Sequence, residues 1–357
     1  MLSLLAPARS SAIAFDAGST GVRACQLTAV RGAMRVVDTL EIRYPTAGAP
    51  VAPTGEDPPA SVLAAALPRL DRLVGQAAFR GSEVSLVLSP PDVRYQTLRI
   101  ADGVLQQPES RIIAAIKWEV ARERRCEPDD LEVRYWRLPV GHQHNVMAVS
   151  ILRAQAQQWF DRLTASQLWL KRIDGAPSAL ARLGVRQISP AKRDLWAVLD
   201  IGLRRSTLTL MIGEVPTYVR AISVGGDDWT RTLAQVFETS PAEAERIKRD
   251  NGITSGGDDE VASIAFASIR DSLTDLVRQI ELCFGYVVQN YAETHPTALL
   301  LTGGGAALAG LDEYLALHVG VPVQRLAAPP VLHPDAGSIL PSSLLAAGAA
   351  LLDLEGA

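Results

Sequence analysis

Cysteine is scarce in this sequence of 357 residues, and the three that it contains, Cys25, Cys126 and Cys283, lie far apart. Three distant cysteines form neither a disulfide framework nor a thiolate metal site, so we expect a reducing compartment. Two of the five histidines, His142 and His144, lie in a polar stretch that indicates a turn between strands. Without acidic or thiol ligands nearby, this pair favours a loop over a metal site.

Long apolar runs are also lacking, and none reaches the roughly 18 to 20 residues that span a bilayer. The N-terminal residues MLSLLAPARSS have no basic region of the kind that begins a secretory signal. The formal net charge of −4 gives no reason to expect nucleic-acid binding. The basic residues at 122–125 are interrupted by Glu123, which is typical of a solvated helix face. We therefore expect a cytoplasmic protein that binds no nucleic acid.

The length of the chain exceeds one ordinary domain, so at least two lobes with their own cores are expected. Proline and glycine at residues 45–59 mark a long connection, and a helix is expected at about residues 60–78. From residue 263 to 290, apolar residues recur every three or four positions. This spacing predicts a long helix that packs against a core.

A short apolar strand that ends in an aspartate occurs twice in the sequence. The first copy, AIAFDAG, ends with Asp16 and Gly18, and the second, WAVLDIG, ends with Asp200 and Gly202. Each copy is followed by a stretch rich in serine and threonine that predicts a hairpin. This weak duplication predicts two matching lobes.

The first copy continues with Ser19 and Thr20, and this Asp-x-Gly-Ser-Thr pattern is compatible with two structures. In a phosphate clamp, the strand-end carboxylate faces Mg²⁺ through water, glycine lets backbone amides approach phosphate oxygens, and the hydroxyl groups add donors. A tight hairpin without a ligand has the same pattern. Taken alone, the motif leaves both alternatives open.

Two later motifs favour the clamp when they are combined with the aspartates. Gly303, Gly304 and Gly305 follow a buried strand, and a turn without side chains at that position admits a nucleotide in α/β folds. Glu245 and Lys248 lie three residues apart on one helix face, where they could form a surface ion pair or bind a ribose and a purine.

The order of these motifs resembles that of the actin-like ATPase fold, and the resemblance narrows to the PilM family of type IV pilus assembly. It covers nearly the whole chain. Four stretches carry it, namely IKWEVARERRCEPDDLEVRYWRL, AISVGGDDWTRTLAQVF, SPAEAERIKRDNG and the closing SSLLAAGAALLDL. The resemblance implies an α/β, ribonuclease H-like fold with ATP or ADP and Mg²⁺ between two lobes.

The resemblance also implies a division of the chain into subdomains. The core of the first lobe would comprise residues 1–81 and 153–190, with a small FtsA-like subdomain inserted at residues 82–152. The core of the second lobe would comprise residues 191–236 and 292–340, with a small subdomain at residues 237–291. Residues 341–357 would form a helix that returns to the first lobe.

Site residues follow from the same resemblance. Asp16 and Asp200 would face the metal. The phosphates would meet Gly18, Ser19, Thr20, Gly202 and Ser206. The adenosine would lie against Glu245, Lys248, Gly303, Gly304 and Gly305.

Two departures from the family pattern bear on this site. After the second Asp-x-Gly, the bulky residues Leu203–Arg205 precede Ser206 and could obstruct the amide cradle, although an arginine there could bind phosphate itself. Before Pro177, where actin-like ATPases commonly carry a group that positions water, this sequence has Ala176. Asp174 is the one candidate for a substitute, so we expect nucleotide binding and at most a weak ATPase.

The resemblance implies a scaffold at the inner face of the inner membrane. Its partner would be the cytoplasmic N-terminal peptide of a PilN-like membrane protein, with other pilus platform or motor components and self-association as further contacts. The alternatives are an active ATPase or small-molecule kinase on the same fold, and a nucleotide-free GspL-like secretion domain. GspL carries a membrane segment after its actin-like part, and since none follows here, we expect the PilM-like protein.

Overall fold

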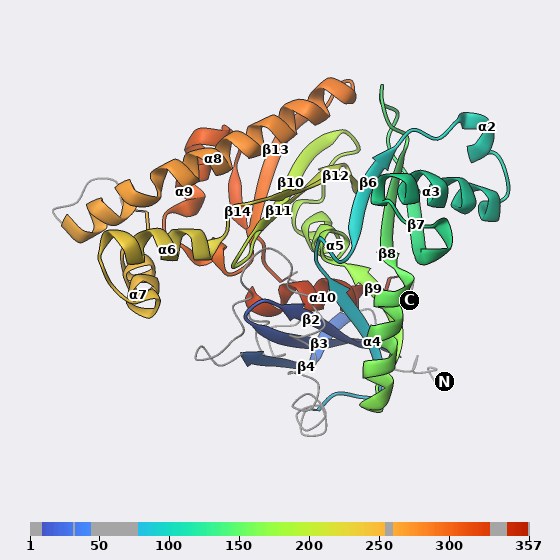
Figure 1. Ribbon diagram of the computed structural model, residues 1–357, viewed down its shortest axis with the longest axis horizontal. Coiled ribbons are helices and arrows are strands. Elements are labelled where there is room, and N and C mark those ends of the chain that lie inside the picture. The colour runs from blue at the N-terminus through green and yellow to red at the C-terminus, as the bar shows by residue number, and fades with distance from the viewer. Residues whose placement is uncertain (1–8, 31–32, 44–77, 254–259, 329–340, 356–357) are drawn as a thin grey trace, which may run out of the picture. The chain divides into compact units, whose positions relative to one another are not determined.

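The chain forms two compact units in the computed structural model, which describes residues 9–30, 33–43, 78–253, 260–328 and 341–355 (Figure 1). Unit 1 comprises Met1–Trp136, Ala148–Gln187 and Ala327–Ala357, and unit 2 comprises Arg137–Met147 and Ile188–Leu326. The helix expected at about residues 60–78 and the connection at 45–59 lie outside the described residues.

Unit 1 is built on a six-stranded sheet in the order β1-β3-β2-β5-β9, with β4 paired to β3. The β2–β3 and β3–β4 pairs are antiparallel, whereas β2, β5 and β9 run parallel. The strands carry alternating or continuous apolar residues, of which Ile13, Phe15 and Leu86 are buried in the core of unit 1. The strands are β1 Arg9–Ser10, β2 Ile13–Gly18, β3 Gly21–Val30, β4 Ala33–Arg43, β5 Glu83–Leu88 and β9 Trp169–Gly175.

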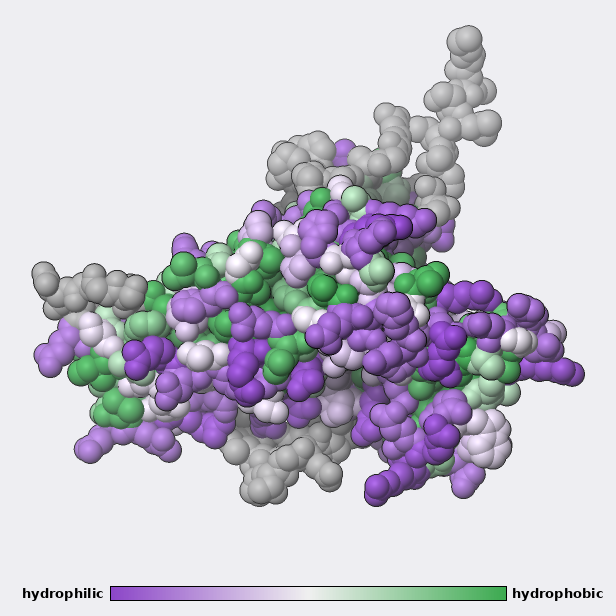
Figure 2. Space-filling model, turned by 90° about the horizontal axis from the view of Figure 1, so that it is seen from above, coloured by the Kyte–Doolittle hydropathy of each residue, from purple (hydrophilic) through white to green (hydrophobic). Residues whose placement is uncertain are grey.

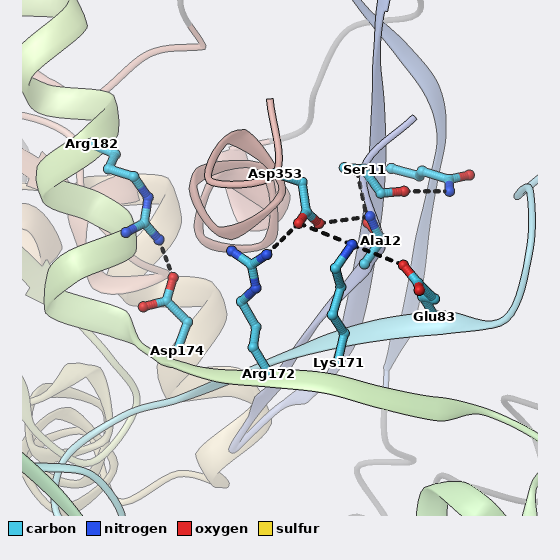
Figure 3. A network of polar contacts seen from close by, with 9 residues as sticks. Ser11, Ala12, Glu83, Lys171, Arg172, Asp174, Arg182 and Asp353 are labelled. Carbon is cyan, nitrogen blue, oxygen red and sulfur yellow. Dashed lines mark hydrogen bonds and ion pairs between the residues drawn. The ribbon is translucent and has the colours of Figure 1, made fainter. Parts of the chain in front are cut away.

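In the described part of unit 1, the helices beside this sheet are α4 Arg153–Ala165, α5 Ala176–Ile188 and α10 Leu344–Leu351. Helix α10 is almost entirely Leu and Ala, and a Cβ on Gly348 would overlap the carbonyl of Ala179, so only glycine permits this crossing of α5. Just beyond α10, the buried Asp353 accepts a hydrogen bond from the amide of Ala12 (2.8 Å) and pairs with Arg172 and Lys171 (Figure 3). These contacts fasten the C-terminal residues to the sheet.

A second, three-stranded sheet in the order β6-β8-β7, which we call the inserted sheet, lies between β5 and β9 in the sequence. Helix α3 buries its own residues Ile112, Ile116 and Val120. It ends before Arg125, which adopts a left-handed conformation. The elements are β6 Arg94–Leu98, α2 Asp102–Leu105, α3 Glu109–Arg124, the 3₁₀ turn η1 Pro128–Asp130, β7 Leu131–Arg137 and β8 Val146–Leu152.

The position of β5 corrects the boundary expected for the inserted part of the chain. Residues 82–152 were expected to form it, but Glu83–Leu88 pairs with β2 and β9 in the large sheet. The inserted sheet therefore begins after Leu88. An apolar strand of this length has the same pattern in either sheet, so the sequence does not reveal which neighbour it joins.

Unit 2 repeats the strand order of unit 1. Its sheet runs β12-β11-β10-β13-β14, which corresponds strand by strand to β4-β3-β2-β5-β9, including the antiparallel hairpin and the parallel neighbour of the central strand. The duplication expected from the two strand endings is thus confirmed in the topology. The strands are β10 Asp194–Ile201, β11 Ser206–Ile212, β12 Val215–Ile222, β13 His295–Thr302 and β14 Val323–Arg325.

The helices among the described residues of unit 2 are α6 Gly226–Val236, α7 Pro241–Asn251, α8 Glu260–Asn290 and α9 Leu311–Val319. The expected stripe of α8 is buried along its length, from Ile269 to Val287. Ser240 caps α7 by accepting a hydrogen bond from the amide of Glu243 (3.2 Å), while the Glu243 carboxylate pairs with Arg246.

The helices in the described parts of the chain are too short or too polar to cross a membrane. Among the large apolar side chains that are exposed, Trp118 lies on α3, Val140 lies in the loop between β7 and β8, and Leu317 lies on α9. On the face seen in Figure 2, hydrophobic residues are interspersed with hydrophilic ones.

Candidate nucleotide site

The first Asp-x-Gly turn lies at the end of the β2–β3 hairpin in unit 1. Gly18 pairs with Gly21 across the turn, and Ser19 and Thr20 are exposed at its tip. A Cβ on Gly21 would overlap the carbonyl of Ile42 in β4, so this glycine is required by the close approach of that strand. The expected phosphate-binding residues of this turn therefore lie together on the surface.

Arg23 is a residue of this turn that the sequence reasoning missed. It lies opposite Asp16 in the β2–β3 register and opposite Glu41 in the β3–β4 register, so the three side chains share one face of the sheet. Its Nη1 is 3.7 Å from Asp16 Oδ2, its Nε is 3.5 Å from Glu41 Oε1, and its Nη2 donates to Thr20 Oγ1 at 2.8 Å. One guanidinium thus lies between two carboxylates. The pairing register of the β2–β3 hairpin is the feature from which this role of Arg23 could have been predicted.

Asp174 lies on the same row of the sheet, because β5 Val87 pairs with Asp16 on one side and with Asp174 on the other. Strands are spaced about 4.8 Å apart, so β9 is about 10 Å from β2. Both oxygens of Asp174 are engaged, since Oδ1 accepts from the Gly175 amide (2.8 Å) and Oδ2 pairs with Arg182 (Figure 3). Burial raises the pKa of Asp174 despite the pairing with Arg182.

The second Asp-x-Gly turn, in unit 2, is closed by backbone hydrogen bonds. The amide of Gly202 donates to Arg205 O (3.0 Å), and the carbonyls of Gly202 and Leu203 accept from the first amides of α6, at Gly226 (3.0 Å) and Asp227 (2.7 Å). The bulky residues Leu203–Arg205 are therefore accommodated by the start of α6. The amide of Gly202, which was expected to bind phosphate, is instead hydrogen-bonded to the backbone of this segment.

Ser206, also expected at the phosphates, is fully buried at the start of β11. Its hydroxyl donates to the carbonyl of Val224 at 2.6 Å. The hydroxyl hydrogen is thus committed to joining β11 to the segment before α6. This contact spans 18 residues, so the sequence pattern could not reveal it.

The triple glycine lies directly against the second turn. Gly303 has a φ of +84°, and a Cβ there would overlap the Asp200 carboxylate. A Cβ on Gly305 would overlap the side chain of Ile201, whereas Gly304 borders open space. Glycine is therefore required at position 303 both by the positive φ and by the closeness of the Asp200 carboxylate. The triple glycine and Asp200 thus lie together within unit 2.

Glu245 and Lys248 form an ion pair with 2.5 Å between Oε2 and Nζ. The buried Lys248 ammonium also donates to Gly226 O (3.0 Å) and Thr230 Oγ1 (2.8 Å), so its three hydrogens are used within the protein. Burial opposes ionisation of Glu245, but hydrogen bonds from Lys248 and Thr230 outweigh it and lower the pKa of Glu245. Lys248 thereby fastens α7 to the residue of α6 that meets Gly202.

The acidic residues offer little for a directly bound metal. Within the described ranges, no group of three or more His, Cys, Asp or Glu side chains could hold one. The charge of Asp16 is offset by Arg23, and Asp200 packs against Gly303. Magnesium keeps several waters in nucleotide sites, so these residues fit an ion held through water and phosphate, with no protein cage.

Comparisons with solved structures find the same fold. The structure of a PilM–PilN type IV pilus biogenesis complex matches with a TM-score of 0.77 and 20% identity, covering 97% of this chain and 99% of that chain. The ethanolamine utilization protein EutJ from Carboxydothermus hydrogenoformans matches with a TM-score of 0.54 and 15% identity, covering 97% of this chain and 90% of that one. MreB 5 of Spiroplasma citri bound to AMPPNP matches with a TM-score of 0.52 and 13% identity, covering 95% of each chain. The predicted actin-like ATPase fold is confirmed.

The sequence itself matches a family model. Among curated proteins, none matches the chain significantly. The model described as "Type IV pilus assembly protein PilM" matches residues 142–340, which is more than half of the chain. This chain therefore belongs to the PilM family of type IV pilus assembly proteins.

Proposed function

We propose that this protein is a nucleotide-binding scaffold of a type IV pilus machine. One observation carries the proposal: three segments far apart in the sequence meet around Asp200 in unit 2. They are the hairpin turn at Gly202, the start of α6 at Gly226, and the triple glycine. Gly303 lies against the strand-end carboxylate of Asp200, and Gly226 meets the carbonyl of Gly202. Glycine backbone beside a strand-end carboxylate is the arrangement that lets phosphates approach closely.

The geometry refines the roles expected for individual residues. Glu245 and the open position at Gly304 are our candidates for adenosine contacts, and Lys248 holds the site together from within. The amide of Gly202 and the hydroxyl of Ser206 are already engaged, which leaves Gly303 and Gly305 as the candidates for phosphate contacts in unit 2. Asp200 remains the candidate that faces the metal. In unit 1, the Arg23 guanidinium joins Gly18, Ser19 and Thr20 as a candidate for binding an anion.

Binding without efficient hydrolysis remains the better proposal. Asp174, the one candidate for a water-positioning carboxylate, is held by Arg182 and by the amide of Gly175. Ala176 begins α5 and can neither accept a proton nor orient water. We therefore propose ATP or ADP, with magnesium held mainly by the phosphates and water, as a structural ligand.

The partner we propose is the cytoplasmic N-terminal peptide of a PilN-like membrane protein. The proposal rests on family membership and on the similarity to a structure of a PilM–PilN complex. Such a partner would place the protein at the inner face of the inner membrane. Other platform components and self-association remain proposals of the same kind.

Calorimetric titration of the whole protein with ATP and ADP, with and without Mg²⁺, tests the nucleotide. We expect saturable binding that Asp200→Ala weakens at least tenfold, with unchanged far-UV circular dichroism. The matched control is Asp194→Ala, at the opposite end of β10, which should bind like the wild type. Absence of binding in every condition would favour a nucleotide-free platform, and turnover well above ~1 per second would favour an enzyme.

A further inference from the structure

Tyr95 links the inserted sheet to the end of the large sheet in unit 1. It lies on β6, and its hydroxyl is 2.8 Å from Ser178 Oγ in the first turn of α5. The same hydroxyl contacts the backbone of Gly175, where a Cβ would overlap it. The side chain thus reaches the turn that joins β9 to α5.

The Tyr95 ring also contacts a second strand of the inserted sheet. It packs edge to face against Trp136 of β7, with 6.2 Å between ring centroids and 65° between ring planes. Aromatic pairs favour this geometry because the positive edge of one ring meets the negative face of the other. Tyr95 is therefore held from both sides, by Trp136 within the inserted sheet and by Ser178 and Gly175 at the large sheet.

The turn that Tyr95 contacts lies next to the row that contains the first Asp-x-Gly motif. Gly175 follows Asp174, which is in register with Asp16 through Val87, and the three strands are parallel. The Gly175 amide is bonded to Asp174 Oδ1 at 2.8 Å. A displacement of the Tyr95 hydroxyl would press on Gly175 and, through it, on the strand ends that lead to Asp16.

We infer that Tyr95 is a positioning residue that couples the inserted sheet to the nucleotide-binding turn at Asp16. The inference rests on the proposed function, because it requires a nucleotide that Asp16 and its neighbours sense. Nucleotide binding then changes the dynamics of β6 and β7, and the Tyr95–Ser178 contact transmits the change. Coupling between two binding sites is reciprocal. If nucleotide changes the affinity of the inserted sheet for a ligand, that ligand must change the affinity for nucleotide by the same factor.

Hydrogen exchange of the whole protein with and without saturating ATP, in Mg²⁺, tests this coupling. In the wild type we expect ATP to change the exchange of peptides that contain β6 and β7 at least twofold. Tyr95→Phe, which keeps the ring but removes the hydroxyl, should abolish this change while the ATP affinity measured by calorimetry stays within about threefold. Ser178→Ala should have the same effect, and the double variant should add nothing to either.

Tyr135→Phe makes the same chemical change on β7 and serves as the matched control, which should keep the wild-type response. The coupling is refuted if ATP binds without altering the inserted sheet, or if Tyr95→Phe and Ser178→Ala keep the full response. A response lost equally in Tyr135→Phe would also refute it, since the effect would then belong to the sheet as a whole. If calorimetry detects no nucleotide binding, the proposed function itself fails, and the coupling fails with it.

Discussion

Arg23 lies directly opposite Asp16 across the β2–β3 hairpin, with 3.7 Å between Nη1 and Oδ2, and directly opposite Glu41 on its other side. The row therefore alternates negative, positive, negative across three neighbouring strands. Because all three side chains are largely buried, the guanidinium is required to keep the two carboxylates from repelling each other. Arg23 thus stabilises the turn at which we propose that an anion binds.

Replacing Arg23 should destabilise unit 1. Arg23→Met leaves Asp16 and Glu41 without the guanidinium, and we expect the free energy of unfolding to fall by about 2 kcal/mol. Urea unfolding measures the change. Arg43→Met is the matched control: Arg43 is 3.2 Å from the same Glu41 but its side chain is 75% exposed, so a change below about 0.5 kcal/mol is expected. Equal effects of the two substitutions would contradict the role given to Arg23.

Lys248 should matter more for structure than its neighbour Arg249, although both bind Glu245. Lys248→Met removes the buried donor to Gly226, Thr230 and Glu245, so we expect a loss of about 2 to 3 kcal/mol together with weaker nucleotide binding. Arg249→Met removes an ion pair whose arginine is 71% exposed, and stability should change little. Chemical denaturation of both variants decides the point, and a stable Lys248→Met protein would argue that its ammonium is free to bind ligand.

Alanine substitutions at two neighbouring glycines should distinguish an effect on stability from an effect on nucleotide binding. Gly303→Ala places a Cβ against Asp200 at a φ of +84°, so we expect a loss of about 2 kcal/mol or more in stability. Gly304→Ala meets open space and should leave the unfolding free energy within about 0.5 kcal/mol of the wild type. If Gly304 contacts adenosine as proposed, its variant should nevertheless bind ATP several-fold more weakly. Wild-type affinity in the Gly304→Ala protein would remove that residue from the site.

Stability should fall in alkaline solution because of buried thiols. Burial, aided by the charge of Asp38, raises the pKa of Cys25 from an ordinary 9.0 to about 12. Above pH 9 the unfolded state loses this proton while the folded state keeps it, so stability decreases by up to about 1.4 kcal/mol per pH unit until pH 12. Cys25→Ala should make the decline measured by urea unfolding between pH 9 and 11 shallower.

The control for this prediction is the range from pH 7 to 8, where the Cys25 thiol is protonated in both states. There the wild type and Cys25→Ala should show parallel pH dependence, offset only by the cost of the substitution. Parallel curves above pH 9 as well would show that Cys25 is not responsible for the alkaline loss.

Local pattern alone was enough to predict several features of this protein. The two strand endings at Asp16 and Asp200 and the buried stripe of α8 depend on residues that are neighbours in sequence, so their periodicity and spacing carry the information. The order of the motifs then led to the PilM family, which the match over residues 142–340 supports.

Tertiary structure alone decided which polar atoms are free to act. The hydroxyl of Ser206 is spent on Val224, Asp174 is bound by Arg182, and the three hydrogens of Lys248 are used within unit 2. Tyr95 reaches Ser178 across 83 residues of sequence. A motif specifies which groups are present, but their lone pairs and hydrogens are committed by contacts between distant segments. Sequence therefore predicted the kind of site, and packing shows which of the predicted residues are already engaged within the protein.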